Sequence, residues 1–335
     1  MLLRLVALVL LGLVAVDTFR TVLLPSAHGL LSRLWARGLW WLATLVPGRP
    51  GLNARRSAGP LSVVATIASW VVLLWFAFAL IYLPDVATLG YSSDVTFEGN
   101  DLVIALYLSG TVLTTLGLGD VAAQSDELRL VVVAQSAGGL ALFTAALGYL
   151  PALYTVVSDL RASAEAISDL EATTPERAAD LLREDAVLTL ESVRRDVIAA
   201  RQHLLRFPSL HHFHPPVGQS VLGVVEGATM LWAVARFGMS AAEHPGVRRQ
   251  AQSLELALHR LVEDTAVHVG AQPSAEGHTE ALAQVERVRG AVRTLAGWTV
   301  EAAEPDPAAV ADLARTNAVM RRYAGLHGYA FPTVT

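Results

Sequence analysis

The most informative part of this 335-residue chain is the stretch Thr114-Thr115-Leu116-Gly117-Leu118-Gly119-Asp120. Before it lies an apolar segment of about 13 residues, which is too short to cross a bilayer. That length suits a helix that enters the membrane and turns back. Non-helical backbone at membrane depth is tolerated only where it is buried in protein or lines a watery path. The short segment and the strand after it therefore predict a re-entrant loop.

The alternation of glycine and leucine in this stretch has a geometric meaning. A dehydrated cation needs a cage of oxygens, and a strand supplies them when its successive carbonyls face one axis. That arrangement requires alternating backbone handedness, and glycine adopts positive φ at little steric cost. Gly117 and Gly119 alternate with Leu116 and Leu118 as this geometry demands. Thr115 can add a hydroxyl oxygen at the inner mouth.

Two uncharged stretches flank the re-entrant segment. Leu61 to Leu83 has 23 residues and Leu130 to Val157 has 28, and each is long enough to cross a hydrocarbon core of about 30 Å. Leu5 to Leu24 is a third candidate span, interrupted by Asp17 and Arg20. These two charges lie three residues apart on a helix, so they predict either a local ion pair or a contact with a neighbouring segment.

The composition agrees with a membrane location. Apolar residues make up 53% of the chain and charged residues 16%, against roughly 25% charged in soluble domains. The chain has no Cys, which excludes disulfides and thiol nucleophiles, and no Lys, which excludes Schiff-base chemistry. The net charge of −5 argues against a nucleic-acid partner.

The charges between the spans predict the orientation. Pro25 to Pro60 contains five Arg and no acid, so the positive-inside rule places it in the cytoplasm. Its basic, tryptophan-rich part, residues 28–46, suits a helix in the headgroup region. Pro84 to Arg129 carries seven acids and a single Arg, and should lie outside with the N-terminus. The chain after about residue 158 is then cytoplasmic in a multi-pass protein of the cell membrane.

These features resemble the pore domain of the potassium channel family. The family signature is Thr-Thr-Val-Gly-Tyr-Gly-Asp, set between an outer helix, a short pore helix and an inner helix. The resemblance covers roughly residues 61–157, and the chain matches the signature at Thr114, Thr115, Gly117, Gly119 and Asp120.

The resemblance implies how an ion would be held. It places K+ ions, with no organic cofactor, on the oxygens of Thr115, Leu116, Gly117 and Leu118, in a filter completed by Thr114 and Gly119. Asp120 would concentrate cations at the outer mouth. One loop cannot encircle an ion, so several copies of the chain are needed, and the resemblance implies a four-fold homotetramer.

The chain departs from the signature at two places. Leu118 replaces a Tyr, and the pore-helix positions that meet it in the family are here Tyr107 and Leu108. Losing both polar partners is nearly neutral, so we expect Leu118 to pack on Leu108. Second pore loops of two-pore-domain potassium channels also read Gly-Leu-Gly-Asp. Thr111 stands where several relatives have a Glu, so we expect water or backbone to hold Asp120.

The inner helix contains candidate gate elements. Ser125 is a plausible N-cap, with acids in the first turn. Gly138 and Gly139 favour either a hinge or tight helix packing through small residues. Pro151 removes a backbone hydrogen bond and should kink the helix near its cytoplasmic end.

The second half of the chain reads as five or six helices. Six residues form a heptad seam that predicts either a coiled coil along a tetramer axis or a helix packed in its own bundle: Ala186, Leu190, Val193, Val197, Ala200 and Leu204. A further stripe consists of Leu282, Val285, Val288, Val292 and Leu295. Val217 to Ala235 is apolar enough for a fourth span, but Glu226 at its middle favours a core helix. The run from His211 to His214 has two possible interpretations, a metal site and a solvated loop.

The sequence thus predicts an all-α membrane protein in three parts. Residues 1–60 form an extra membrane helix and a basic interfacial segment, residues 61–157 the pore domain, and residues 158–335 a cytoplasmic helical domain. The leading hypothesis is a potassium-selective channel, with copies of itself and lipid as partners. The alternatives are a weakly selective monovalent cation channel and a non-conducting, membrane-anchored sensor or scaffold. We do not expect the protein to be an enzyme. We expect residues 158–335 to bind a ligand or partner that the sequence does not identify.

Overall fold

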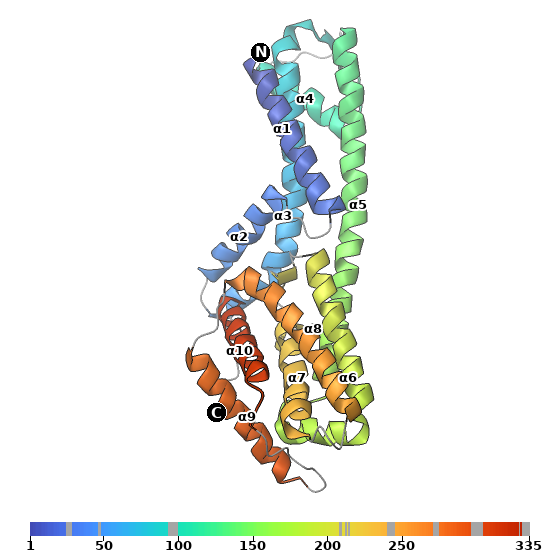
Figure 1. Ribbon diagram of the computed structural model, residues 1–335. Helices are drawn as coiled ribbons and strands as arrows, with labels where there is room; N and C mark the ends of the chain where they lie inside the picture. The colour runs from blue at the N-terminus through green and yellow to red at the C-terminus, as the bar shows by residue number, and fades with distance from the viewer. Residues whose placement is uncertain are drawn as a thin grey trace. The chain divides into compact units, whose positions relative to one another are not determined.

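The structure is a computed structural model that describes residues 1–24, 29–45, 48–92, 100–207, 210, 211, 213, 215–239, 245–270, 275–295, 304–327 and 329. Most of this part of the chain is helical (Figure 1), and its strands are one pair of two residues each. It divides into two compact units. The N-terminal unit comprises Met1–Tyr154 with Phe207–Phe213, and the C-terminal unit comprises Thr155–Arg206 with His214–Thr335.

Five helices build the N-terminal unit. They are α1 (Leu2–Thr18), continued by a π-helical turn η1 (Phe19–Leu23), α2 (Leu30–Thr44), α3 (Gly48–Tyr82), continued by a 3-10 turn η2 (Leu83–Thr88), α4 (Asp101–Leu113) and α5 (Asp126–Ser168). Helix α3 packs against α1, α2 and α4. Helix α5 starts as predicted, because the Ser125 hydroxyl accepts a hydrogen bond from the backbone N–H of Leu128 at 3.3 Å. The helix belongs to this unit up to Tyr154.

The start of α1 lies beside the end of α3. Arg4 forms an ion pair with Asp85 in η2, while Asp17, one helix length further on, meets Trp70 in the middle of α3. The two helices therefore run antiparallel.

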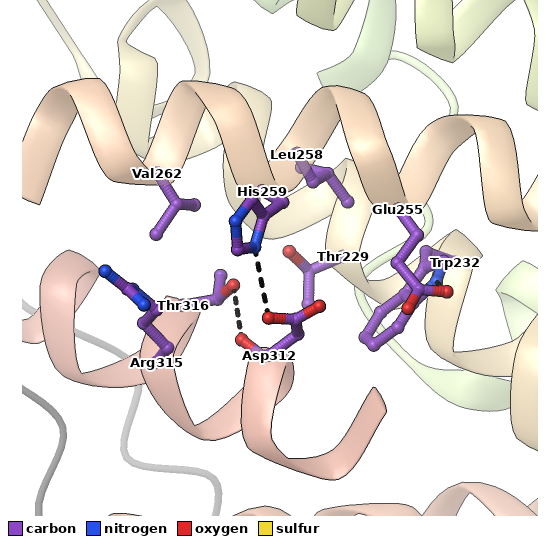
Figure 2. A pocket seen from close by; sticks show the side chains of 9 residues that line it. All are labelled: Thr229, Trp232, Glu255, Leu258, His259, Val262, Asp312, Arg315 and Thr316. Atoms are coloured by element: carbon purple, nitrogen blue, oxygen red, sulfur yellow. Dashed lines mark hydrogen bonds and ion pairs between the residues drawn. The ribbon is translucent and has the colours of Figure 1, made fainter. Parts of the chain in front are cut away.

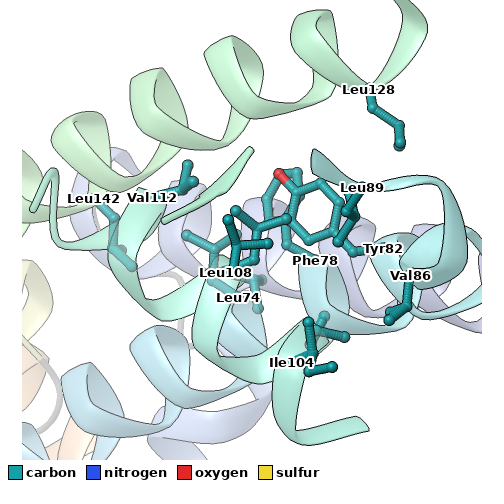
Figure 3. Close-up of a cluster of buried hydrophobic side chains, with 14 of the residues drawn as sticks. Leu74, Phe78, Tyr82, Val86, Leu89, Ile104, Leu108, Val112, Leu128 and Leu142 are labelled. Atoms are coloured by element: carbon teal, nitrogen blue, oxygen red, sulfur yellow. The ribbon is translucent and has the colours of Figure 1, made fainter. Parts of the chain in front are cut away.

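The core of the N-terminal unit lies between α3, α4 and the start of α5. Leu74, Phe78 and Tyr82 on α3 recur every four residues, so they share one face. They pack against Ile104, Leu108 and Val112, which form the equivalent face of α4 (Figure 3). This packing fixes the short helix against the long one, and with it the direction in which the chain leaves Leu113.

Four described helical segments are long and apolar enough to cross a membrane. Within an 18-residue apolar part of each of the first three, the share of buried residues is 17% for Leu2–Leu23, 39% for Ser57–Thr88 and 17% for Asp126–Ser168. The fourth, Val221–Gly238, is 78% buried. Its neighbours in the C-terminal unit cover it, as expected of a core helix rather than a span.

The C-terminal unit is a bundle of helices. Its elements are α6 (Pro175–Arg206), a 3-10 turn η4 (Val217–Gln219), α7 (Val221–Ala233), continued by a π-helical turn η5 (Val234–Gly238), α8 (Pro245–Val269), α9 (Ala275–Arg293) and α10 (Pro307–His327). Helix α6 packs against α7 and α8, and α10 packs against α8 and α9.

The heptad seam of α6 faces the inside of this bundle. All six of its residues are buried by helices of the same chain, so the bundle interpretation holds and the coiled coil does not. The stripe on α9 differs from the prediction at its first residue. Leu282 is exposed, and the neighbouring Ala281 is buried in its place with Val285, Val288 and Val292. The buried residues are spaced four, three and four positions apart, which is what a helix face requires.

Candidate functional site

Helix α4 leads into residues 114–120, which are called the filter stretch below because they resemble the potassium channel signature. Its N-cap is Asn100, whose side-chain oxygen accepts a hydrogen bond from the backbone N–H of Val103 at 3.0 Å. It ends after 13 residues at Leu113, as the apolar segment predicts. The Ser109 hydroxyl donates to the carbonyl oxygen of Trp75 on α3 at 2.7 Å. The indole N–H of Trp75 donates to the carbonyl oxygen of Leu106 on α4 at 2.8 Å.

The backbone after α4 alternates in handedness. Thr115, Gly117 and Gly119 have φ of 55°, 53° and 79°, whereas Leu116 and Leu118 between them do not have positive φ. The sequence predicts this alternation at the two glycines, and the structure extends it to Thr115. A threonine in the left-handed region is strained, and the surrounding hydrogen bonds hold it there.

Two peptide groups of this stretch are oriented by the end of α4. The carbonyl oxygen of Thr111 accepts hydrogen bonds from the N–H groups of Leu116 and Gly117, at 2.8 and 3.3 Å. All described peptide bonds are trans, and in a trans peptide group the carbonyl points opposite to the N–H. The carbonyl oxygens of Thr115 and Leu116 therefore point away from α4. Thr111 thus supports the filter stretch through its main chain.

The side chains of the stretch lie on an exposed surface of the single chain. Leu116 is 62% exposed and Leu118 is 59% exposed. Leu108, by contrast, is buried in the core, so the expected cuff of Leu118 on Leu108 does not close within one chain. The hydroxyl of Thr114 donates to the carbonyl oxygen of Gly110 at 2.8 Å. It therefore terminates α4, and its proton is not available to other groups.

Asp120 is fixed by three hydrogen bonds at the end of the stretch. Its Oδ2 accepts from the Tyr107 hydroxyl at 2.5 Å, and its Oδ1 accepts from the backbone N–H of Val121 at 3.0 Å. Its carbonyl oxygen accepts from Ser92 N–H at 2.9 Å, next to the antiparallel strands β1 (Gly90–Tyr91) and β2 (Val121–Ala122). A side chain, Tyr107, thus joins the backbone in holding Asp120, where water or backbone was expected.

A buried polar network behind the filter stretch escaped the sequence reasoning. Gln135 on α5 is completely buried. Its amide nitrogen donates to the carbonyl and hydroxyl oxygens of Ser109 at 2.8 and 2.9 Å. Its amide oxygen accepts from the Tyr82 hydroxyl at 2.7 Å. The network joins α3, α4 and α5. The available signal was a single amide near the start of a long uncharged span, because a polar group inside a membrane protein needs partners.

Asp17 connects the N-terminal helices in a similar way. It is 2% exposed. Its Oδ2 accepts from the indole N–H of Trp70 at 2.8 Å, and its Oδ1 accepts from the backbone N–H of Leu31, in the first turn of α2, at 3.0 Å. A carboxylate is favoured at that position by the dipole of α2. Of the two predictions for Asp17, contact with neighbouring segments is the one that the structure shows.

The candidate gate glycines differ in their surroundings. A Cβ on Gly139 would lie 2.9 Å from both the carbonyl oxygen and a methyl group of Leu113 at the end of α4, which favours the packing interpretation there. Gly138 has no atom within 4 Å of that position, and its role as a hinge stays a prediction. Helix α5 continues unbroken through Pro151. Of the histidine run, His212 and His214 lie outside the described residues.

Two comparisons with known proteins gave matches. Residues 68–155 match a family described as ion channel. The chain is also 28% identical, over 200 residues, to the uncharacterized membrane protein YdjJ of Bacillus subtilis (strain 168). That alignment covers 58% of this chain and 57% of the relative, so the chain spans little more than half of the relative's length. No solved structure matches the chain.

The ion channel match includes α3 from Ala68 onward, the whole of α4, the filter stretch and α5 up to Thr155. It confirms the all-α membrane fold class, and the chain carries over residues 68–155 a segment similar to the two-helix, potassium-channel-like domains of ion channels.

Proposed function

We propose that the protein is a potassium-selective channel in which four copies surround one filter. Each copy would contribute the oxygens of Thr114 to Gly119, with Asp120 at the outer mouth. The protein would lie in the plasma membrane, with the N-terminus outside and residues 158–335 in the cytoplasm. The match to ion channels supports transport rather than catalysis.

One observation carries this proposal. The backbone alternates in handedness at Thr115, Gly117 and Gly119, while Thr111 takes up the N–H groups of Leu116 and Gly117. Carbonyl oxygens are thereby left on the exposed side of the stretch, and none of the described residues donates a hydrogen bond to those of Thr115 and Leu116. Such oxygens replace the hydration shell of a cation once sibling subunits close the ring. The C-terminal end of α4, which carries partial negative charge, lies beside the same stretch.

A weakly selective cation channel is the second candidate, and Leu118 favours it. The side chain of Leu118 is 59% exposed and stands where the potassium channel signature has a Tyr. The filter wall therefore has no polar side-chain anchor at this position. In its place, the Tyr107–Asp120 hydrogen bond ties the outer end of the stretch to α4.

Flux into vesicles tests the proposal. The protein is reconstituted in liposomes, and uptake is measured under a potassium gradient and under a sodium gradient, with and without barium. We expect potassium flux that barium blocks, and sodium flux at least about tenfold smaller. Equal fluxes would establish the weakly selective alternative. Absence of both from correctly inserted protein would support a sensor or scaffold.

Two glycine variants make the test specific to the filter backbone. A Cβ has free space at both Gly117 and Gly12, but Gly117 has φ +53° whereas Gly12 lies in the ordinary helix α1. Gly117→Ala therefore adds backbone strain of about 1–2 kcal/mol per subunit, at the peptide groups that would face the ion. We expect Gly117→Ala to abolish potassium flux and Gly12→Ala to leave it unchanged, with both proteins inserted. Undiminished flux through Gly117→Ala would refute the pore assignment.

A further inference from the structure

A charged cavity that is open to solvent lies between η5, α8 and the start of α10 in the C-terminal unit. It has a volume of about 350 Å³ and is lined by Arg236, Gln252, Glu255, Leu256, His259, Asp306 and Asp312. A second, water-sized void of about 10 Å³ shares Glu255, His259 and Asp312 with it (Figure 2). The larger volume lies in the range of small-molecule sites.

The charges around this cavity do not balance. Three carboxylates, those of Glu255, Asp306 and Asp312, face one guanidinium. Arg236, whose side chain is only 10% exposed, pairs through Nη2 with Asp306 at 2.6 Å and lies 3.7 Å from Glu255 through Nε. With the imidazole of His259 neutral, the lining of the larger cavity carries a net charge of about −2. The small void is also lined by Arg315, whose charge is paired with Glu263 at 2.6 Å. The excess of negative charge favours a cationic occupant.

Glu255 and Asp312 are held in place by groups that leave acceptor capacity free. The indole N–H of Trp232 donates to Oε2 of Glu255 at 3.2 Å, and Nδ1 of His259 lies 3.1 Å from Oδ1 of Asp312. An ionised carboxylate has about four acceptor sites. Burial raises the pKa of the Glu255 carboxyl, and the charges of Asp312 and Asp306 raise it further, against the opposing effects of Trp232 and Arg236.

Thr229 supplies an independent sign of a missing ligand. The residue is 6% exposed, and its hydroxyl oxygen is buried with no hydrogen-bond partner. Two other buried helical threonines of this unit, Thr265 and Thr316, donate to the carbonyl four residues earlier at 2.8 Å. Thr229 instead lines the small void beside His259 and Asp312 (Figure 2). A buried hydroxyl without a partner is costly, so a group that bonds to it would be stabilising.

We infer that this cavity binds a small aliphatic amine in its protonated form. One ammonium group would enter the void, where Thr229, Glu255 and Asp312 offer oxygen acceptors to its three N–H donors. The aliphatic body would lie in the larger cavity against Leu256. A second ammonium group, in a diamine, would match the remaining negative charge near Asp306. The planar fork of a guanidinium suits a single carboxylate better than three converging acceptors.

Calorimetric titration of the full-length protein in detergent tests this inference, with 1,4-diaminobutane as the probe and butylamine as the single-charge comparison. We expect saturable binding of 1,4-diaminobutane and weaker binding of butylamine. Tetramethylammonium carries the same charge as butylamine but has no N–H donor, and we expect it not to compete. Equal competition by tetramethylammonium, or by magnesium ions at the same concentration, would overturn the inference.

Four variants locate the site. Asp312→Asn and Glu255→Gln each remove one charged acceptor, and we expect affinity to fall about 10- to 100-fold. Thr229→Val keeps the shape of a buried side chain and should weaken binding by about three- to tenfold. Asp180→Asn changes an exposed carboxylate on α6, outside the cavity, and should bind as the wild type does. No saturable binding to the wild type, or equal binding to all variants, would refute the site. None of these outcomes depends on whether the protein conducts ions.

Discussion

Helices α5 and α7 have similar apolar compositions but opposite surroundings. Each contains a stretch long and apolar enough to cross a membrane, yet 17% of that stretch is buried for α5 and 78% for α7 together with η5. Leu140, Phe143 and Leu147 on α5 are more than 60% exposed, whereas Leu222 and Leu231 on α7 are completely buried. Apolar composition thus indicates that a helix avoids water. Whether other helices of the same chain cover it depends on how the chain packs.

Two polar groups inside apolar surroundings also differ in their hydrogen-bond partners. In the N-terminal unit, both ends of the Gln135 amide have partners on other helices. In the C-terminal unit, the Thr229 hydroxyl has none. A satisfied network fixes the geometry of the helices that it joins. An unsatisfied group leaves capacity for a ligand.

The largest expected effect tests the contrast between α5 and α7. Leu231→Ala opens a cavity in the core of the C-terminal unit and should destabilise it by about 2–5 kcal/mol. Leu147→Ala changes a side chain that the single chain leaves exposed, and should alter the stability of either unit by no more than about 0.5 kcal/mol. Amide hydrogen exchange measured by mass spectrometry separates the two units.

In that experiment, Leu231→Ala should speed exchange in α7, α8 and α10 and leave α3 and α4 unchanged. Equal acceleration by Leu147→Ala would show that α5 is buried by its own chain, against the contrast drawn above.

A smaller effect is expected from the polar network of the N-terminal unit. Gln135→Leu leaves the buried Tyr82 hydroxyl without its acceptor, at a cost of about 1–3 kcal/mol. Tyr82→Phe leaves the amide oxygen of Gln135 without its donor. The double variant removes both partners, so it should be more stable than the two single losses predict. Thermal unfolding of the four proteins in detergent measures this coupling, and simple additivity would show that the hydrogen bond contributes nothing.

The smallest expected effect concerns pH and the C-terminal unit. Burial lowers the pKa of His203 on α6, against an opposing effect of Asp159, with a further lowering by Arg206. Folding therefore favours the neutral imidazole. The stabilisation is present above the ordinary pKa of about 6.5 and is lost as the pH falls through the lower pKa of the folded state.

His203→Gln should reduce the loss of stability between pH 7 and pH 5 by less than about 1 kcal/mol, because the side chain is only partly buried. Unfolding by urea at both pH values measures the difference between wild type and variant. A variant that loses as much stability as the wild type on acidification would contradict the assignment.

Features that depend only on neighbouring residues followed from the order of residues alone. The short α4 follows from the length of its apolar segment, and the start of α5 follows from Ser125. The alternating backbone at Gly117 and Gly119 follows from the conformational freedom of glycine. Each of these is set by the chemistry of a few consecutive side chains, so the order of residues is sufficient.

The three-dimensional fold, by contrast, determined which distant residues meet. Asp17 contacts Trp70, Gln135 contacts Tyr82, and Tyr107 holds Asp120. It also decided that the seam of α6 is covered by its own bundle and that α7 is a core helix. A hydrogen bond or a buried face requires a partner at contact distance. The periodicity of one segment indicates which face of a helix is buried. The packing of the whole chain determines which residues contact that face.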